Sequence, residues 1–305
     1  MIKHIELENF KCHRRFEDNL SQITILTGGN SAGKSSIIQA ILFAVKSFHN
    51  ISKRYVKTND IYGLNLGLPG SIISENFEGQ EMKIILYMQD YGTNIYNVTC
   101  CLDDIDETSF RLCNCDEMLK ALEVPVSILK TGIYYLNAER TGPRIVYGMN
   151  SECNDYVGTY GEYTGYIISE MDKRQRLDPR LSLPGSLKIS PISRFSANCE
   201  EWLQLVIPET SLQYMVDTEK NMSMIKFKNS GDYYFPTATG FGISYVLPVI
   251  VQALLASMGE NSILLVENPE AHLHPYSQSA IGKFLAYIAA AGVQVIMETH
   301  SGTCY

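Results

Sequence analysis

The segment Gly28–Ser35 has the residue types of a loop that holds phosphate groups. It reads Gly-Gly-Asn-Ser-Ala-Gly-Lys-Ser and fits the pattern G-x-x-x-x-G-K-[ST]. Glycines let the backbone turn its N–H groups inward around a polyphosphate, and a helix N-terminus adds positive potential there. In this pattern Lys34 neutralises the β- and γ-phosphates and Ser35 holds Mg²⁺, so the segment predicts binding of ATP with Mg²⁺.

The flanks of this loop supply the elements that the pattern requires. Ile23–Leu26 is an apolar, β-branched run typical of a buried strand, and apolar residues recur at helical spacing from Ile37 to Val45. We therefore expect a strand, the loop and a helix in succession. The residues expected to contact the nucleotide here are Asn30, Ser31, Ala32, Gly33, Lys34, Ser35 and Ser36.

A second group of chemically active residues follows two apolar strands near the end of the sequence. Ser262–Glu267 is an apolar run that ends in an acid, where a P-loop enzyme places the carboxylate that orders Mg²⁺ and its water shell. Pro275 predicts the first residue of a helix. The strand Val293–Met297 then leads to His300, which can reach a γ-phosphate or orient water. Taken alone, a loop histidine of this kind has no assigned role.

The glycines and serine of Gly240–Ser244 precede a predicted helix from about Tyr245 to Ser257. Gly240, Gly242 and Ser244 would expose helix N-terminal amides, which form an anion site. An ordinary turn with a serine N-cap is also compatible with this pattern.

Composition limits the class of protein. The chain has 305 residues, 45% hydrophobic residues and a net charge of −8, which argues against a surface that coats nucleic acid non-specifically. The apolar runs are shorter than a membrane span, and the start alternates like a strand, unlike a signal peptide. Eight cysteines without a compact disulfide framework predict a reducing, cytoplasmic location.

Taken in order, the segments TGGNSAGKSS, GFGISYVLP, LLVENPEAHLHP and ETHS resemble the ATPase heads of the SMC/RecF/OLD branch of ABC-type ATPases. The greatest likeness is to stand-alone prokaryotic AAA-type ATPases of defence and repair loci, which YLNAERTGPR and VGTYGEY also resemble. The likeness runs from residue 1 to residue 301. It implies an α/β P-loop NTPase fold: a two-lobed head with a mixed core sheet, a β-rich nucleotide lobe and a helical segment.

The resemblance also implies an organisation and an assembly. Lobe I would cover about 1–150, the helical segment about 151–206 and lobe II about 207–305, in one ABC-type ATPase domain that is short at its C-terminus. Two heads would close on ATP head to tail. Each site would then pair Gly28–Ser35 and Glu267 of one copy with Gly240–Ser244 of the other, and His300 would be the switch histidine.

Two departures from that family affect the expected chemistry. ABC-type ATPases place two acids side by side after the strand, whereas this chain has Glu267 followed by Asn268, which positions water but cannot accept its proton. Glu270 is the expected substitute, or else turnover is slow. The chain also ends at Tyr305, which leaves no room for an OLD-type nuclease domain, so cutting would belong to a partner or to a missing region.

Four features keep two interpretations each. The segment Asn9–Leu20 is expected to link two strands, and it contains Lys11, His13, Arg14 and Arg15. These basic side chains either approach the nucleotide, with Arg14 as the expected contact, or form a solvated turn. The basic segment Lys173–Arg194 contacts nucleic acid or is a solvated face. Cys100, Cys101, Cys113 and Cys115 are ordinary strand cysteines or a zinc cluster of non-standard spacing. The string Glu270-x-His272-x-His274 is a dimer-contact loop or a metal site.

The function predicted from sequence is that of an ATP-hydrolysing switch. Glu267, Asn268, Glu270 and His300 are the predicted catalytic residues, and Ser35 and Glu267 the predicted Mg²⁺ ligands. The switch would work as an ATP-dependent homodimer or higher oligomer with a separate effector protein, a nuclease or similar, in anti-phage defence or DNA repair and away from membranes. The alternatives are a nucleotide-gated binding module with negligible turnover and, less favoured, a P-loop kinase of a small molecule.

Overall fold

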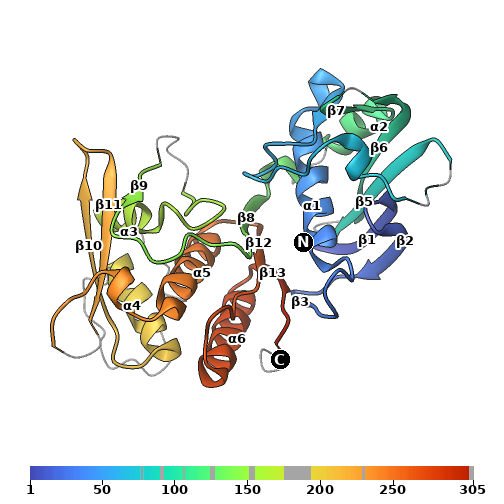
Figure 1. The fold of residues 1–305 in the computed structure, drawn as a ribbon. Helices are drawn as coiled ribbons and strands as arrows, with labels where there is room; N and C mark the ends of the chain where they lie inside the picture. The colour runs from blue at the N-terminus through green and yellow to red at the C-terminus, as the bar shows by residue number, and fades with distance from the viewer. Residues whose placement is uncertain are drawn as a thin grey trace. The chain divides into compact units, whose positions relative to one another are not determined.

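The computed structural model describes residues 1–75, 77, 79–89, 93–105, 107–123, 128–150, 155–174, 194–228 and 231–301. The chain divides into two compact units, Met1–Gly132 and Ile133–Tyr305 (Figure 1). Each unit contains one part of the chemistry expected from sequence. They are called unit 1 and unit 2 below.

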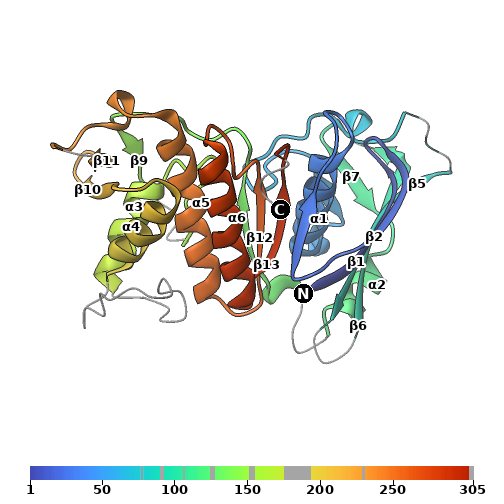
Figure 2. The ribbon, with the colours of Figure 1, turned by 90° about the horizontal axis from the view of Figure 1, so that it is seen from below.

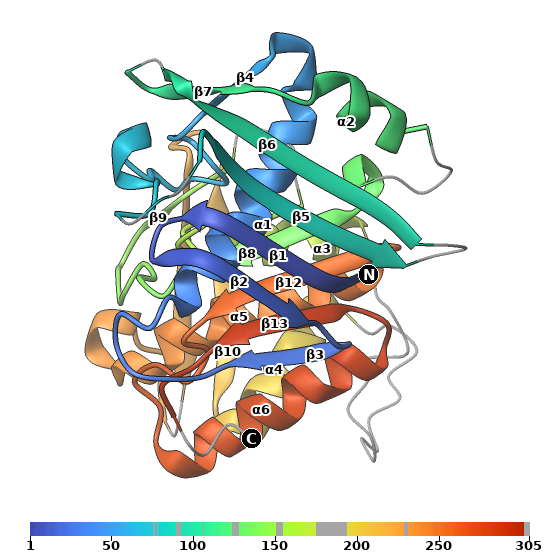
Figure 3. The same cartoon turned by 90° about the vertical axis from the view of Figure 1, so that its right-hand side faces the viewer.

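Unit 1 is built on a six-stranded antiparallel sheet. Its strand order is β2-β1-β5-β6-β7-β4, and the wide face is seen in Figure 3. The strands are β1 Ile2–Phe10, β2 His13–Asn19, β4 Tyr55–Lys57, β5 Glu81–Gln89, β6 Thr93–Ile105 and β7 Ser109–Leu112. Alternate residues of β5 are buried, as the period of a half-buried strand requires.

Helix α1, Lys34–His49, covers one face of this sheet with the apolar residues that the spacing predicted. Its Phe43 ring lies 6.3 Å from Phe10 of β1 and 6.2 Å from Phe110 of β7. Strand β3, Ile23–Leu26, precedes the helix. The smaller helices of unit 1 are α2 Cys115–Ala121, η1 Ile51–Lys53, η2 Pro69–Ser71 and η3 Ile128–Lys130.

The structure corrects the prediction that Asn9–Leu20 is a link between two strands. The link contains β2 itself, which pairs with β1 and leaves a tight turn at Lys11 and Cys12. Asn9 and Lys11 have φ of 59° and 51°, and this backbone makes the sharp reversal possible. The basic residues conceal the strand because they occupy its exposed positions.

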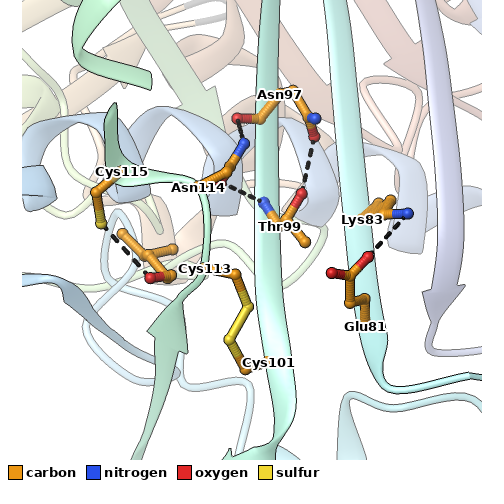
Figure 4. Close-up of a disulfide and its surroundings, with 9 residues drawn as sticks. Glu81, Lys83, Asn97, Thr99, Cys101, Cys113, Asn114 and Cys115 are labelled. Atoms are coloured by element: carbon orange, nitrogen blue, oxygen red, sulfur yellow. Dashed lines mark hydrogen bonds and ion pairs between the residues drawn. A yellow bond between two sulfur atoms is a disulfide. The ribbon is translucent and has the colours of Figure 1, made fainter. Parts of the chain in front are cut away.

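Cys101 of β6 and Cys113 form a disulfide with their Cα atoms 5.7 Å apart (Figure 4). Asn114 accepts a hydrogen bond from the Thr99 amide and donates one to the Asn97 carbonyl, both at 3.0 Å, so the turn after β7 is fixed to β6 beside the disulfide. The interpretation of both residues as ordinary strand cysteines is thus wrong. Cys113 lies just past β7, where the bend turns its side chain toward β6.

Unit 2 contains a buried sheet in which β8 Gly132–Leu136, β12 Ser262–Glu267 and β13 Gln294–Glu298 lie in the order β13-β12-β8. β12 and β13 are parallel, and their register runs from Ile263 opposite Gln294 to Glu267 opposite Glu298. Helices α5 Phe241–Met258 and α6 Pro275–Ala290 pack on these strands (Figure 2). The carboxyl ends of β12 and β13 therefore lie side by side.

A second sheet in unit 2 has the order β10-β11-β9 and packs with two helices. Its strands are β9 Tyr147–Gly148, β10 Ser211–Asp217 and β11 Met222–Lys228, and the helices are α3 Thr164–Arg174 and α4 Phe195–Val206, with η5 Pro236–Ala238 nearby. Asp172 of α3 accepts hydrogen bonds from the Ser196 amide at the start of α4 and from the Tyr214 hydroxyl. Trp202 of α4 is buried, with its ring 4.8 Å from Phe284 of α6.

Helix α5 corrects two expectations. It starts at Phe241 rather than near Tyr245, so Gly242 and Ser244 belong to its first turns. By length and composition alone this 18-residue helix could cross a membrane, but 78% of it is buried inside the protein. Apolar residues all around a helix are what a core position requires.

Candidate nucleotide site

The loop between β3 and α1 in unit 1 is built by its backbone. Gly28, Ser31 and Gly33 have positive φ values of 145°, 64° and 88°. The residues from Thr27 to Ala32 are exposed, whereas Gly33 and the serines after Lys34 are half-buried at the helix start. Such a backbone, opening into a helix N-terminus, is suited to bind an anion.

Lys34 is the buried cation of this loop. Its Nζ donates to the Gly28 and Gly29 carbonyls at 3.0 and 2.8 Å, and the residue is only 6% exposed. The ammonium is therefore held within the curl of the loop and does not extend into solvent. Phosphate oxygens are stronger partners for an ammonium than neutral carbonyls, because their negative charge adds the attraction between opposite charges to the hydrogen bond.

The turn between β1 and β2 packs on this loop. His13 Nε2 lies 3.2 Å from the Gly33 carbonyl, and the Cys12 thiol lies 3.8 Å from Ser36 Oγ. A Cβ built on Gly33 would come within 2.5 Å of Cys12 Sγ and 2.6 Å of His13 Nε2, so the position requires glycine on steric as well as conformational grounds. Arg14 is an exposed residue of β2, and its assignment to the nucleotide stays a prediction.

The carboxyl ends of β12 and β13 in unit 2 bring two buried acids together. Glu267 and Glu298 are paired in register and are 6% and 5% exposed. Burial raises the pKa of Glu267 to about 7. The hydrogen bond from Tyr135 Oη to Glu267 Oε1, at 2.8 Å, opposes that shift, and the charge of Glu298 adds to it.

The turn after β12 explains the asparagine that departs from the family pattern. Asn268 has a φ of 45°, and its amide donates to the Glu298 carbonyl at 2.8 Å. Among non-glycine residues, asparagine and aspartate adopt this left-handed conformation most readily. A glutamate at this position would be strained by the backbone that the structure has here.

Glu270 is fixed by the end of β13. Its Oε1 accepts the Thr299 hydroxyl at 2.5 Å and the His300 amide at 3.0 Å, and the residue is 6% exposed. In the part of the chain that the structure describes, Glu270 Oε2 and Asn268 Oδ1 are buried without a hydrogen-bond partner. Buried polar atoms are nearly always satisfied, so these two are the expected positions of a water or a ligand.

His300 is more exposed than the acids around it. Its imidazole lies 3.7 Å from Glu298 Oε1, and 42% of the side chain is exposed. The structure thus brings four predicted residues, Glu267, Asn268, Glu270 and His300, to the same end of unit 2.

The Gly240–Ser244 segment lies against the turn that follows the acids. A Cβ on Gly242 would come within 2.8 Å of the His272 carbonyl, and the Tyr245 ring lies 4.4 Å from the His272 ring. A hollow of about 210 Å³ is lined here by Ile207, Thr239, Gly240, Gly242, Ile243, His272, Leu273, His274 and Ser277. Gly240 and Gly242 line this hollow at the α5 N-terminus, whereas Ser244 is buried one turn on.

Two residues that hold the Glu267 turn were not assigned a role from sequence. Tyr135 of β8 donates to the carboxylate, and the buried Arg140 donates to the Glu267 and Asn268 carbonyls. The charged pair Glu139-Arg140 at the end of a strand was a signal for this place. The sequence could not show that Arg140 faces the backbone of another strand.

The structure describes only part of the basic segment Lys173–Arg194, and it also bears on the predicted metal sites. Of the segment Lys173–Arg194, residues 175–193 lie outside the described residues. Lys173 and Arg174 form ion pairs with Glu170 and Asp155 at 2.7 and 2.5 Å, as expected for a solvated face. Among the described residues, groups of three or more histidine, cysteine, aspartate or glutamate side chains suited to a metal ion are absent.

Two family models match separate parts of the chain. A family model described as "AAA ATPase domain" matches residues 1–120, and one described as "AAA domain, putative AbiEii toxin, Type IV TA system" matches residues 166–303. The DNA double-strand break repair Rad50 ATPase of Methanococcus maripaludis is 50% identical over 46 residues, 15% of this chain and 5% of that protein. Structural maintenance of chromosomes protein 6 of Dictyostelium discoideum is 29% identical over 82 residues, 27% of this chain and 7% of that protein. The chain therefore spans a small part of the length of these relatives.

Solved SMC heads are similar over nearly the whole chain. An SMC head bound to the C-terminal winged-helix domain of ScpA has a TM-score of 0.56 at 17% identity, covering 99% of this chain and 90% of that one. An SMC head with an extended coiled coil, bound to the C-terminal domain of ScpA derived from Pyrococcus furiosus, has a TM-score of 0.54 at 14% identity with the same coverage. At these identities the likeness is one of fold. The chain therefore has the fold of an SMC head, and two AAA family models match separate parts of it.

Proposed function

We propose that this head is an ATP-binding and ATP-hydrolysing switch that acts with a separate effector protein in nucleic-acid processing, in anti-phage defence or DNA repair. One observation carries the catalytic part of the proposal. Glu267, Glu270 and His300 gather at the carboxyl ends of two adjacent parallel strands, which is where ligand crevices form in α/β sheets. ATP and Mg²⁺ are the cofactors that this site and the Gly28–Ser35 loop would take.

The chain's own groups fit such a ligand. Lys34 would exchange its two carbonyl partners for phosphate oxygens, and the α1 N-terminus would add its dipole. Ser35 and Glu267 are the residues that would hold Mg²⁺. The ion would neutralise phosphate charge and order its water shell.

Glu270 has the features of a general base for the attacking water. Its Oε1 is fixed by Thr299 and the His300 amide, which leaves the buried Oε2 as the acceptor. Asn268 is held at the turn and would orient water through its amide. His300 is partly exposed and can move toward a γ-phosphate.

The glycine-lined start of α5 would serve a second copy. In this proposal Gly240, Gly242 and Ser244 of one head contact the nucleotide held by the other, and the adjacent His272 and His274 lie in the same contact loop. The hollow beside Gly240 and Gly242 supports this assignment because it opens at a helix N-terminus.

The partner and the biological setting rest on relatives. One matched family model carries a toxin description, one relative is described as a double-strand break repair ATPase, and two similar heads were solved with ScpA domains. We propose a protein effector, with the Lys173–Arg194 segment as the place where nucleic acid would bind. A cytoplasmic location is part of the proposal.

A second candidate is a nucleotide-gated binding module with negligible turnover. The backbone of Asn268 favours it, because a glutamate as the second acid after the strand would be strained in the left-handed turn. Slow turnover suits a clamp, which must persist in its closed state.

Phosphate release and molar mass test both candidates. The wild type should release phosphate from Mg-ATP, and its molar mass in solution should double with ATP as two copies associate. Lys34→Ala should show neither effect. Absence of ATP binding, or equal turnover in Lys34→Ala, would overturn the switch. ATP-dependent mass doubling without phosphate release would instead establish the module.

A further inference from the structure

Arg140 is a buried residue of unit 2 whose guanidinium donates hydrogen bonds to the backbone at the end of β12. It is 3% exposed, and its two terminal nitrogens donate to the Asn268 carbonyl at 2.9 Å and to the Glu267 carbonyl. Burial lowers the pKa of Arg140 to about 10, against the charges of Glu270 and Glu267, so the group remains a cation at neutral pH. Buried charges are retained where they are paired and hydrogen-bonded.

Tyr135 contacts the side chain of Glu267, whereas Arg140 contacts its backbone carbonyl. Its hydroxyl donates to Glu267 Oε1 at 2.8 Å. Burial first, and the Glu267 charge second, raise the pKa of Tyr135 far above its usual range, which keeps the phenol a donor. The Ala138 amide also bonds to the Glu267 carboxylate. The segment Tyr135–Arg140 thus contacts both the carboxylate and the carbonyl of Glu267.

This segment is itself supported by a second layer. The Asn137 amide donates to the Thr159 carbonyl at 2.9 Å, and the Thr141 amide donates to the Tyr160 carbonyl at 2.7 Å. The Val157 amide in turn donates to the buried Gln252 side chain of α5 at 3.1 Å. The support therefore extends to the helix that begins with Gly240–Ser244.

We propose that Tyr135 and Arg140 are positioning residues for the Mg²⁺-side carboxylate: Tyr135 orients the Glu267 side chain and Arg140 fixes the end of β12 that carries it. This inference rests on the proposed function, because it gives Glu267 its task. Outer-shell partners of this kind typically change metal affinity or activity about 10–100-fold when they are removed. Both residues act through Glu267.

The sequence provides matched controls. Tyr134 is the neighbour of Tyr135 in β8, and successive residues of a strand face opposite sides. Arg144 belongs to the same YLNAERTGPR segment as Arg140 but is exposed. Tyr134→Phe and Arg144→Gln therefore remove the same groups without touching Glu267.

The decisive measurement is the affinity for ATP with Mg²⁺ and with EDTA, by titration calorimetry on the full chain. Glu267→Gln sets the reference for complete loss of the tightening that Mg²⁺ gives. We expect Tyr135→Phe and Arg140→Gln to lose that tightening by about 10–100-fold with unchanged affinity in EDTA, Arg140→Lys to recover part of it, and both controls to match the wild type.

Each outcome is informative. If Glu267→Gln loses the tightening while Tyr135→Phe and Arg140→Lys keep it in full, the positioning role is wrong and the proposed function stands. If the wild type does not bind Mg-ATP, the proposed function fails and the inference falls with it. If Arg140→Gln does not fold, Tyr135→Phe and Arg140→Lys decide the question. A loss of ATP affinity both with Mg²⁺ and with EDTA would indicate only a structural role and would contradict the positioning role.

Discussion

The loop of unit 1 and the acid cluster of unit 2 are built on opposite principles. The loop is exposed from Thr27 to Ala32, and its shape depends on positive φ values that glycine supplies. The acid cluster is buried, and its shape depends on side chains from separate strands that hydrogen-bond to one another. The loop is shaped by its backbone conformation, and the acid cluster is shaped by a network of side-chain hydrogen bonds.

This difference determines how a substitution should affect each site. In the loop, we expect an added Cβ to disturb nucleotide binding while the rest of unit 1 stays folded. A side-chain network is a set of buried polar groups, which costs stability when one group loses its partner. Four substitutions test the contrast: the two at Gly33 and Glu270 should change binding or turnover by about 100-fold or more, and the two at Glu267 and Asn268 should change stability by smaller amounts.

Gly33→Ala should abolish nucleotide binding. Its φ of 88° and the close Cys12 and His13 side chains leave no room for a methyl group, so ATP affinity should fall by at least about 100-fold. Calorimetric titration with Mg-ATP measures this loss. Gly70→Ala is the matched control, because a Cβ there meets nothing within 4 Å. Retained affinity in Gly33→Ala would show that the loop tolerates a different backbone.

Glu270→Gln should separate binding from turnover. A general base typically contributes about 10²–10⁴-fold, so phosphate release should fall by that factor while ATP affinity is kept. Steady-state phosphate release and calorimetry provide the two numbers. Glu260→Gln, an exposed acid of unit 2, should behave as the wild type. A rate that survives in Glu270→Gln would assign the base elsewhere.

Glu267→Gln should stabilise the metal-free protein above neutral pH. The pKa of Glu267 is raised to about 7 in the fold, so ionisation is disfavoured there, and the wild type loses stability as pH rises from about 4.5 to about 7. The glutamine variant lacks this loss, so its advantage should grow across that window to about 3 kcal/mol and then stay constant. Denaturant unfolding in EDTA at several pH values measures it. An advantage independent of pH would contradict ionisation of the buried carboxyl as the cause.

Asn268→Ala should destabilise unit 2 by about 1 kcal/mol, because alanine is strained in the left-handed region. Asn268→Gly should be nearly neutral, since glycine adopts that conformation without a steric cost. Thermal melting of the two variants compares them directly. Equal melting temperatures would mean that the backbone at this turn relaxes when the asparagine is removed.

Sequence reasoning was strong where a local pattern determines the structure. The strand, loop and helix around Lys34 follow from spacing alone, and so do the Ser262–Glu267 strand and the helix that begins at Pro275. In each case the signal and its cause lie within about one element. The fold class was predicted correctly for the same reason.

Sequence reasoning was weak where partners come from distant strands. No local pattern pairs Tyr135 with Glu267 or directs Arg140 to the carbonyl of Asn268. β2 was missed because its exposed face carries charges, and α5 was started late because glycines at a helix N-terminus look like a loop. Tertiary contacts, which one sequence does not display, decide these features.

The position of Trp202 has a practical consequence. It is the only tryptophan in the sequence, and it is buried against Phe284 of α6, so the sequence of unit 1 contains none. Fluorescence excited selectively at the indole therefore reports the unfolding of unit 2 by itself. Paired with far-ultraviolet circular dichroism of the whole chain, the emission spectrum can reveal whether the two units melt together.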